Sequence, residues 1–235
     1  MNTIPSVDLR DFTSGDPARK EAFVRQIGRA FEEIGFVALS GHFLEDALVE
    51  RLYREVKNFF DLPEETKRKY EIPGIGGQRG YTSFGKEHAK GRKEGDLKEF
   101  WHFGQYVEDA PDLAATYPEN VQVTELPDFN AAGKEAYKML EKTAIYVLRA
   151  LALHLQLPEA YFDGYVRNGN SILRPIHYPP ITEEPKEAVR AAAHGDINLI
   201  TLLMGAHGKG LQVQNHQGAW IDAIARPDQL MINVG

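Results

Sequence analysis

The chain has no cysteine among its 235 residues. This absence excludes disulfide bonds, zinc sites built from thiolates, iron–sulfur clusters and a cysteine nucleophile. Any metal ion that this protein binds must therefore be held by histidine, by carboxylate or by backbone oxygen.

The sequence also lacks an excess of positive charge and a long apolar run. Its 27 Lys and Arg residues against 34 Asp and Glu give a formal net charge of −7. This acidic balance argues against a nucleic acid or an anionic membrane as a partner. The opening residues, MNTIPSVDLRDF, do not have the charged-then-apolar profile of a signal peptide, and no stretch is long and apolar enough to cross a bilayer. We therefore expect a cytoplasmic protein without nucleic-acid or membrane partners, and we also expect it to be a monomer.

Residues 191–204, AAAHGDINLITLLM, place His194 and Asp196 one residue apart at the head of an apolar run. Side chains in a strand alternate between its faces, so an imidazole and a carboxylate at this spacing leave the same side. The apolar run after them predicts a buried strand. One His and one carboxylate are two thirds of the 2-His-1-carboxylate triad of non-haem Fe(II) enzymes. The alternative is structural: a hydrogen-bonded His and a turn-capping Asp at the start of the strand.

Apolar periodicity predicts helices mainly in the first two thirds of the chain. Asp16-Pro17 is an N-cap followed by proline at the first helical position, and apolar residues at 3–4 spacing continue to Ile34. A second helix is predicted over residues 44–60. A third is predicted over 128–157, with Leu155 in its buried stripe and Pro158 ending it.

Short strands are predicted at 4–9, 36–39, 97–107, 171–178, 211–214, 220–224 and 230–234. In 171–178, alternation puts Arg174, Ile176 and Tyr178 on one face, and Pro175 lacks an N–H donor, which predicts a sheet edge or a bulge there. Residues 72–95 are rich in glycine and charge and are predicted to form a long loop, either functional or mobile. Several short strands with turns at this spacing indicate a β-sandwich or barrel. The fold class expected is mixed α+β.

Short pieces of sequence in a fixed order resemble the isopenicillin N synthase-like, Fe(II)/2-oxoglutarate-dependent dioxygenase family. Each piece alone is weak, but their order and spacing together are specific, and they run almost end to end. The pieces are Ile4-Pro5-Ser6-Val7-Asp8-Leu9, Gly35-Phe36-Val37, Phe59-Phe60-Asp61-Leu62-Pro63, Arg79-Gly80-Tyr81, Lys98-Glu99-Phe100, Tyr178-Pro179-Pro180, His194-Gly195-Asp196, Gly210-Leu211-Gln212-Val213, Trp220-Ile221 and Ile232-Asn233-Val234-Gly235.

The resemblance implies a double-stranded β-helix (jelly-roll) core with an N-terminal helical region. It implies an N-terminal dioxygenase region over residues 1–110, a scaffold helix and connection over 111–169, and the jelly-roll domain over 170–235. It also implies that His194 and Asp196 bind Fe(II) and that Tyr178 hydrogen-bonds 2-oxoglutarate, an alternative being an ordinary core tyrosine. With O2, such an enzyme oxidises a small-molecule substrate by hydroxylation, desaturation or ring closure and releases succinate and CO2.

The family's second iron-binding His, and the Arg that pairs with 2-oxoglutarate, lie beyond the Asn-Val-Gly strand, where the printed sequence ends. The resemblance therefore leads us to expect that the C-terminal part of the jelly roll is missing from this chain. His207 and His216 remain after Asp196, but both lie in turn-like sequence and are expected to be exposed. Two alternatives stay open: an Fe(II)/O2 oxidase that does not use 2-oxoglutarate, and a non-catalytic jelly-roll binding protein.

The substrate cannot be identified from these residues, but its contacts are expected at two places. The loop at 72–95 and the aromatic strand after it are predicted to line the entrance to the site, and Asn198 shares the face of the two metal ligands. The predicted substrate contacts are Tyr81, Phe84, Trp101, Phe103 and Asn198. A core position is the alternative for the aromatic residues, above all for Trp101.

Overall fold

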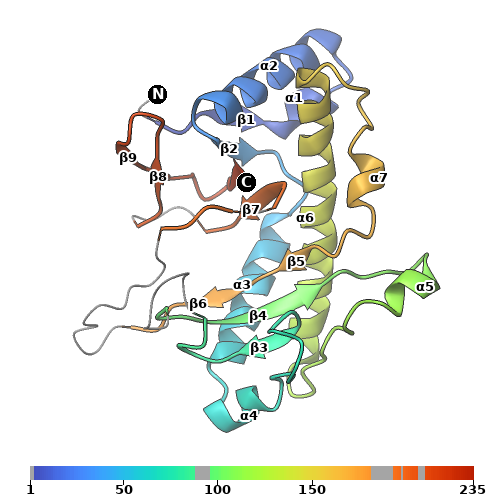
Figure 1. The fold of residues 1–235 in the computed structure, drawn as a ribbon, viewed down its shortest axis with the longest axis vertical. Helices are drawn as coiled ribbons and strands as arrows, with labels where there is room; N and C mark the ends of the chain where they lie inside the picture. The colour runs from blue at the N-terminus through green and yellow to red at the C-terminus, as the bar shows by residue number, and fades with distance from the viewer. Residues whose placement is uncertain (1–2, 88–95, 181–192, 197, 206–209) are drawn as a thin grey trace. The chain divides into compact units, whose positions relative to one another are not determined.

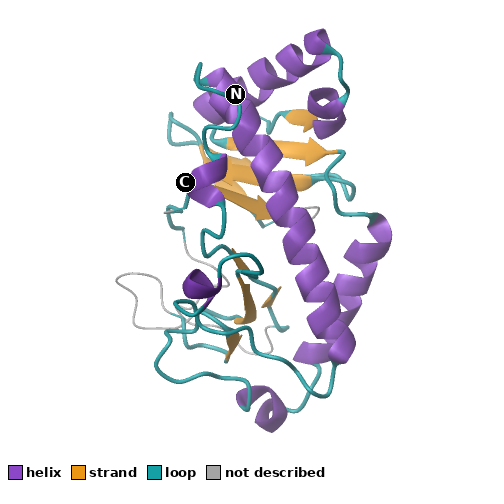
Figure 2. Cartoon of the chain, turned by 90° about the vertical axis from the view of Figure 1, so that its right-hand side faces the viewer, coloured by secondary structure: helices purple, strands orange, loops and turns teal. Residues whose placement is uncertain are grey.

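A computed structural model of the chain describes residues 3–87, 96–180, 193–196, 198–205 and 210–235. Helices and strands are both present throughout (Figures 1 and 2), which confirms the mixed α+β class. The chain divides into two compact units. Unit 1 comprises Met1–Asp46, Met139–Arg167 and Gly195–Gly235, and unit 2 comprises Ala47–Lys138 and Asn168–His194.

Unit 1 begins with β1 (Ser6–Asp8), α1 (Leu9–Thr13), α2 (Pro17–Glu33) and β2 (Phe36–Ser40). The predicted cap of α2 is confirmed, because the Asp16 carboxylate accepts hydrogen bonds from the backbone N–H of Ala18 at 2.8 Å and of Arg19 at 3.4 Å. Later in the chain come α7 (Asp163–Val166), β7 (Ile200–Leu203), β8 (Gln212–Gln214), β9 (Trp220–Asp222) and β10 (Leu230–Val234).

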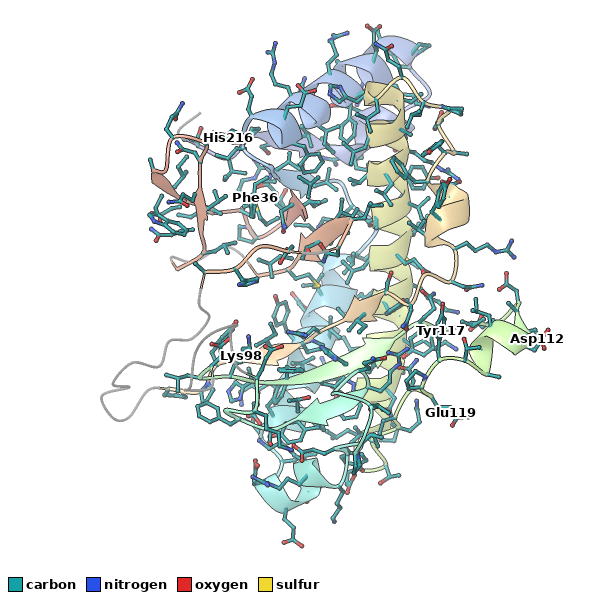
Figure 3. The ribbon with its side chains drawn as sticks, viewed as in Figure 1. Phe36, Lys98, Asp112, Tyr117, Glu119 and His216 are labelled. Carbon is teal, nitrogen blue, oxygen red and sulfur yellow. The ribbon has the colours of Figure 1, made fainter. Side chains whose placement is uncertain are left out.

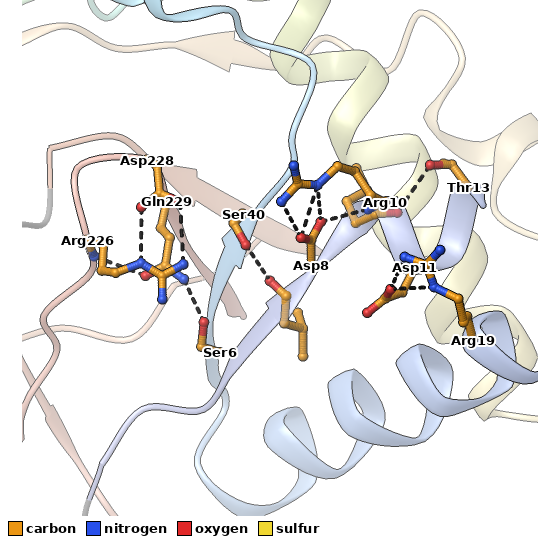
Figure 4. Close-up of polar contacts among 12 residues, drawn as sticks. Ser6, Asp8, Arg10, Asp11, Thr13, Arg19, Ser40, Arg226, Asp228 and Gln229 are labelled. Atoms are coloured by element: carbon orange, nitrogen blue, oxygen red, sulfur yellow. Dashed lines mark hydrogen bonds and ion pairs between the residues drawn. The ribbon is translucent and has the colours of Figure 1, made fainter.

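A four-stranded sheet in the order β1-β2-β10-β7 is the centre of unit 1. The strand β1 runs parallel to β2, whereas β10 pairs antiparallel with both β2 and β7. Side-chain contacts around the first strand link it to β2 and to the residue before β10 (Figure 4). Gln229 donates to the Ser6 hydroxyl at 2.6 Å, and the Ser40 hydroxyl donates to the Val7 carbonyl at 3.3 Å. The strand order places Ile200–Leu203 beside β10, at one end of the described sheet.

The strand predicted at 191–204 is shorter and less buried than expected. Residues 193–196 have no regular secondary structure, β7 begins at Ile200, and residues 191–192 and 197 lie outside the described residues. The prediction of a buried strand is wrong, since Leu199 is 52% exposed and Leu203 is 36% exposed. The physical reason is the position of β7 in the sheet. Among the described strands β7 pairs with β10 alone, so it is an edge strand of the described sheet and its apolar side chains have neighbouring strand residues along one edge only.

The long helix α6 (Pro127–His154) contributes residues to both units. Its predicted range ended three residues later, and Leu155, expected in the buried stripe, lies beyond the helix and is 57% exposed. His154 packs beside Gly28 of α2 and contacts the Glu32 carboxylate through Nε2 at 2.9 Å. This contact agrees with a structural or surface role for His154.

Unit 2 contains α3 (Asp46–Phe60, whose first residue belongs to unit 1), α4 (Glu64–Arg68), β3 (Gly80–Thr82), β4 (Glu99–Gly104), α5 (Pro111–Ala114), β5 (Ile172–Leu173) and β6 (Ile176–His177). The strand β3 lies inside the segment predicted as a loop, of which residues 88–95 lie outside the described residues. All three short strands pair antiparallel with β4.

The register between β4 and the 172–177 segment is continuous across Pro175. Phe103 pairs with Leu173 and Phe100 with Ile176, so His102 lies opposite Arg174 without an inserted residue. The N–H of Trp101 donates to the Pro175 carbonyl at 3.0 Å, and proline has no N–H to return the bond. The predicted bulge is therefore wrong, whereas the predicted edge position agrees with the described pairing, in which β5 and β6 contact β4 alone.

This register assigns the side chains around β4 to two faces, because residues directly opposite each other in a sheet point to the same side. We call one the aromatic face; it carries Glu99, Trp101 and Phe103 of β4, with Tyr81 and His177 opposite. We call the other the polar face; it carries Lys98, Phe100 and His102, with Tyr178, Ile176 and Arg174 opposite them by alternation.

The aromatic face lies in the hydrophobic core of unit 2. Phe59 of α3 stacks on Phe129 of α6 with ring centroids 4.9 Å apart and meets the Trp101 ring edge-on at the same distance. The buried members of this core are Phe59, Phe60, Tyr70, Tyr81, Trp101, Phe103, Val123, Phe129 and Tyr137. Burial of this many aromatic rings makes the core the main source of hydrophobic stabilisation in unit 2.

Candidate functional site

Asp196, one of the two predicted metal ligands, belongs to unit 1 and is half buried. Its Oδ2 accepts hydrogen bonds from the Thr201 hydroxyl at 3.0 Å and from the Asn233 side-chain amide at 2.8 Å. Thr201 and Asn233 are directly paired across β7 and β10, so both side chains leave the same face of the sheet and reach one carboxylate oxygen. Such donors fix the orientation of the carboxylate, as is common around metal-ligating aspartates.

The sequence did not identify Thr201 or Asn233 as site residues. Strict alternation from His194 puts Thr201 on the face away from the ligands, and this expectation is wrong because the chain is not extended before Ile200. Asn233 belongs to the last of the sequence pieces that carry the family resemblance, and no role in the site was predicted for it. Asn198, predicted to contact substrate, donates to the Thr201 hydroxyl at 2.8 Å, and its contact with substrate stays a prediction.

His194, the other predicted ligand, is exposed and is the last residue of unit 2. The boundary between the units falls between His194 and Gly195, so the two predicted ligands belong to different units. In the part of the chain that the structure describes, no three His, Asp or Glu side chains come together as a metal site. An imidazole and an oriented carboxylate are each suitable ligands for Fe(II), and binding of iron by these two residues stays a prediction.

His216 and His207, the two histidines that follow Asp196, were expected to be exposed. His216 follows β8 near the turn of the β8–β9 hairpin, where Figure 3 labels it, and it is exposed. Its ring contacts the Glu32 carbonyl at 3.4 Å. His207 lies outside the described residues.

Tyr178, the predicted 2-oxoglutarate ligand, is half buried and follows β6 directly. Burial raises its pKa above the usual value, so the phenol keeps its proton at neutral pH and is able to donate a hydrogen bond to a carboxylate. The charged groups that act on this pKa are Lys98, Asp96, Arg174 and Glu87. Figure 3 labels Lys98, the residue opposite Tyr178 by alternation.

Glu99 is the centre of a buried ionic network on the aromatic face, next to Tyr178 along the sheet. Its carboxylate accepts from Lys67 Nζ at 2.7 Å and from the Tyr81 hydroxyl, and His177 Nδ1 lies 2.7 Å away. Burial opposes ionisation of Glu99, but the hydrogen bonds from these partners outweigh it and hold its pKa below the usual value. The network anchors β6 to β4, because His177 and Glu99 are directly paired.

The aromatic residues predicted to contact substrate lie on the aromatic face. Tyr81 and Phe103 are each 2% exposed and Trp101 is fully buried, all within the core of unit 2. Their neighbours are other aromatic side chains, which favours the packing role that was the alternative for them. Phe84 is different, since it is 47% exposed and lies after β3. Substrate contact by these four residues stays a prediction.

A surface cleft of about 280 Å³ lies in unit 1, between α2 and α6. Its lining is mainly apolar, with Phe31, Leu148, Leu151 and Phe162 among the lining residues. The lining includes none of the predicted site residues. This cleft therefore does not coincide with the chemistry assigned to the chain.

Family models match most of the chain. Residues 4–125 match the N-terminal model of the non-haem dioxygenases in morphine synthesis, and residues 169–235 match the 2OG-Fe(II) oxygenase superfamily. A proline hydroxylase, buaE, from Petromyces alliaceus is 31% identical over 99% of this chain and 74% of its own length. A leucoanthocyanidin dioxygenase from Malus domestica is 28% identical over 99% of this chain and 63% of its own length.

Solved structures agree with these matches. A protein from Caulobacter crescentus, assigned to the 2OG-Fe(II) oxygenase family, superposes with a TM-score of 0.88 at 38% identity, over 100% of this chain and 74% of its own. A full-length protein from Neurospora crassa, solved in complex with alpha-KG, superposes with a TM-score of 0.83 at 29% identity, over 99% of this chain and 71% of its own. In the described part of this chain, no helix is long and apolar enough to cross a membrane.

Proposed function

The chain belongs to the 2OG-Fe(II) oxygenase superfamily, in its isopenicillin N synthase-like family, as a 2-oxoglutarate-dependent non-haem iron dioxygenase; from this premise we propose which of its residues carry the reaction. His194 and Asp196 bind Fe(II), and Tyr178 binds a carboxylate of 2-oxoglutarate. The substrate is a small molecule that is hydroxylated, desaturated or ring-closed with O2, while 2-oxoglutarate leaves as succinate and CO2.

The observation that carries the proposal is the carboxylate of Asp196 held by two donors on one oxygen. Thr201 and Asn233 reach it from adjacent strands, at 3.0 and 2.8 Å. A side chain oriented from two separate strands is preorganised at no further entropic cost when a ligand binds. Iron, when bound here, supplies the redox chemistry with O2 and the cosubstrate, and the protein supplies position and exclusion of water.

Tyr178 contributes a neutral phenol at the same pH at which a carboxylate ligand is fully ionised. Such a hydrogen bond to a charged acceptor is stronger than one between neutral groups. The continuous register of β4 with β6 and the buried network at Glu99 and His177 fix the strand that precedes Tyr178. These contacts support a role in which the hydroxyl is already in place before the cosubstrate arrives.

We further propose that the chain folds in the 170–235 region as part of a double-stranded β-helix. The antiparallel pairs β7–β10 and β8–β9 support this assignment. The division into a region at 1–110, a scaffold at 111–169 and a jelly-roll domain at 170–235 remains part of the proposal.

Calorimetric titration tests the ligand assignments without requiring a substrate. Mn(II) is titrated first in place of Fe(II), followed by 2-oxoglutarate under anaerobic conditions. His194→Ala and Asp196→Asn are expected to abolish Mn(II) binding, while His216→Ala, a matched control at an exposed His, leaves it unchanged. Tyr178→Phe is expected to weaken 2-oxoglutarate binding about tenfold, the size of one hydrogen bond to a charged group, while leaving Mn(II) binding intact.

Tyr161→Phe is the matched control for the phenol, because Tyr161 is exposed and lies in unit 1. Equal Mn(II) affinity in wild type and Asp196→Asn would contradict the metal assignment. Unchanged 2-oxoglutarate affinity in Tyr178→Phe would contradict the cosubstrate assignment. Succinate release that requires Fe(II) and O2 then tests the reaction itself, and turnover of a substrate without succinate would contradict the use of 2-oxoglutarate.

A further inference from the structure

Arg174 extends across the polar face of unit 2 from the position opposite His102. Its Nε donates to His102 Nε2 at 2.6 Å, and its guanidinium carbon lies 4.4 Å from the centre of the Phe100 ring. Phe100 and His102 are alternate residues of β4, so the flat guanidinium is held against the sheet by a ring face and a hydrogen bond. The side chain has little freedom left to lose when a ligand binds.

His102 holds Arg174 without neutralising it. Its Nδ1 lies 2.6 Å from the Gly77 carbonyl, which requires a proton on Nδ1 and leaves the lone pair of Nε2 to accept from Arg174. Burial, and next the charge of Arg174, lower the pKa of His102 to about 4. The imidazole is therefore neutral at physiological pH, and the positive charge of Arg174 stays uncompensated by it.

The ion pair between Arg174 and Glu87 is long and one-sided. Arg174 Nη1 lies 3.1 and 3.5 Å from the two Glu87 oxygens, whereas Lys98 Nζ lies 2.6 Å from the same carboxylate. The side chains of Arg174 and Glu87 are 37% and 34% exposed, so solvent screens this pair. No described residue accepts a hydrogen bond from Arg174 Nη2. The outer edge of the guanidinium, made by Nη2 and the second N–H of Nη1, is thus free of described partners.

We propose that Arg174 binds a carboxylate of the small-molecule substrate in a two-point contact that replaces its contact with Glu87. Glu87 remains paired with Lys98. The paired N–H donors of an arginine match the two oxygens of a carboxylate, and the position of Glu87 itself demonstrates that a carboxylate fits beside this side chain.

The assignment to substrate rests on the proposed function, because it uses Tyr178 as the cosubstrate ligand. Arg174 and Tyr178 lie on the same face and four residues apart, which in an extended chain separates their Cα atoms by about 13 Å. A small molecule anchored by its acid at Arg174 therefore spans the distance toward the cosubstrate. The inference narrows the substrate class from a small molecule to a small carboxylic acid.

Binding of fluorinated acids to the protein alone, followed by ¹⁹F NMR, tests the proposal without a known substrate. The probes are 4-fluorobenzoate, 4-fluorophenylacetate and 3-(4-fluorophenyl)propanoate, each compared with its neutral carboxamide at neutral pH. The variants are Arg174→Gln, Arg174→Lys and Glu87→Gln. Arg226→Gln is the matched control, since Arg226 forms an exposed pair with Asp228 in unit 1.

In wild type, at least one acid is expected to bind about tenfold more tightly than its amide, the difference made by a two-point charged contact. Arg174→Gln is expected to remove this preference, Arg174→Lys to retain a smaller part of it, and Arg226→Gln to leave it intact. Glu87→Gln is expected to strengthen binding of the acid, because it removes the competing carboxylate. Circular dichroism establishes that each variant is folded before the titration.

Two kinds of result in the titrations with fluorinated acids would overturn the proposal. The first is that no acid binds more tightly than its amide, or that Arg174→Gln keeps the preference. The second is that Glu87→Gln weakens acid binding as much as Arg174→Gln, which would show that the Glu87 pair is structural.

The titration of 2-oxoglutarate separates this inference from the proposed function. Its affinity is expected to be unchanged in Arg174→Gln, and a loss would assign Arg174 to the cosubstrate and refute the substrate role. Acid preference lost in Arg174→Gln, with no succinate release by wild type, would leave the Arg174 carboxylate site in place while the proposed function fails. Succinate release by wild type with no acid preference would support the proposed function and overturn the inference about Arg174.

Discussion

Removal of the Glu99 carboxylate is expected to destabilise unit 2 more than any surface ion pair does. Glu99 is 5% exposed and Lys67 is 6% exposed, and their charged atoms lie 2.7 Å apart. In Glu99→Gln the ammonium of Lys67 stays buried, and its remaining negative partner is the carboxylate of Glu64, which is 49% exposed and lies 3.5 Å away. Breaking a buried pair from one side costs about 3–5 kcal/mol, because the remaining charge is desolvated and uncompensated.

A double variant separates the value of the pair from the cost of an orphaned charge. In Lys67→Met combined with Glu99→Gln, no buried charge is left, so the loss of stability is expected to be smaller than in Glu99→Gln alone. The matched control is Glu135→Gln. Glu135 pairs with Arg51 in the same unit, but the two side chains are 53% and 38% exposed, so the expected change is about 1 kcal/mol or less.

Urea unfolding followed by tryptophan fluorescence measures these differences, because Trp101 is fully buried in the core of unit 2. The pKa of Glu99 is lowered in the folded state, so its contribution is fully present above the ordinary value near 4.5 and is lost as the pH falls through the lowered value. A loss below about 1 kcal/mol in Glu99→Gln, or a double variant that loses as much stability as Glu99→Gln alone, would refute the reasoning.

Three further predictions concern other parts of the molecule. His102→Gln is expected to flatten the pH dependence of thermal unfolding, because burial lowers the pKa of His102 to about 4 in the folded protein and the unfolded chain takes up the proton first. The wild-type protein is therefore expected to lose up to about 3 kcal/mol of stability as the pH falls from about 6.5 to 4. Parallel pH curves for the two proteins would contradict this prediction. Asn233→Leu removes one donor from Asp196 and is expected to weaken Mn(II) binding about tenfold in calorimetry, so an unchanged dissociation constant would count against the orienting role. Leu148→Ala removes a side chain of α6 that is 3% exposed and is expected to lower the free energy of unfolding in urea by about 2–5 kcal/mol. Leu155→Ala, at a side chain that is 57% exposed, is expected to change it by less than about 0.5 kcal/mol. Equal losses in the two variants would show that the helix boundary is misplaced.

The two faces of β4 give the aromatic and polar residues of unit 2 separate roles. Trp101 and Phe103 belong to a packed core, whereas His102 and Arg174 form a hydrogen-bonded pair at a partly exposed position. A substrate contact is better supported on the second face, because Tyr178 follows the same alternation. The aromatic composition of β4 alone had predicted that the substrate contacts lie on the aromatic face.

Local features of the chain were determined by the sequence itself. Asp16 before Pro17 predicts the start of α2, because a carboxylate cap and a fixed proline φ act over three or four residues. Alternation in 171–178 predicts that Arg174 and Ile176 share a face, and the register confirms this. The spacing of His194 and Asp196 also predicts ligand chemistry from local sequence, and metal binding by this pair stays a prediction.

Only the tertiary structure decided which distant residues meet. Thr201 and Asn233 lie 32 residues apart and converge on Asp196 because β7 and β10 pair in one register. Arg174 meets His102 across 72 residues for the same reason. A pattern of period two fixes which side chains share a face of a strand, but it does not name the partner strand or the register. Packing against the rest of the core sets the partner strand and the register, and the packing energy depends on residues from the whole chain.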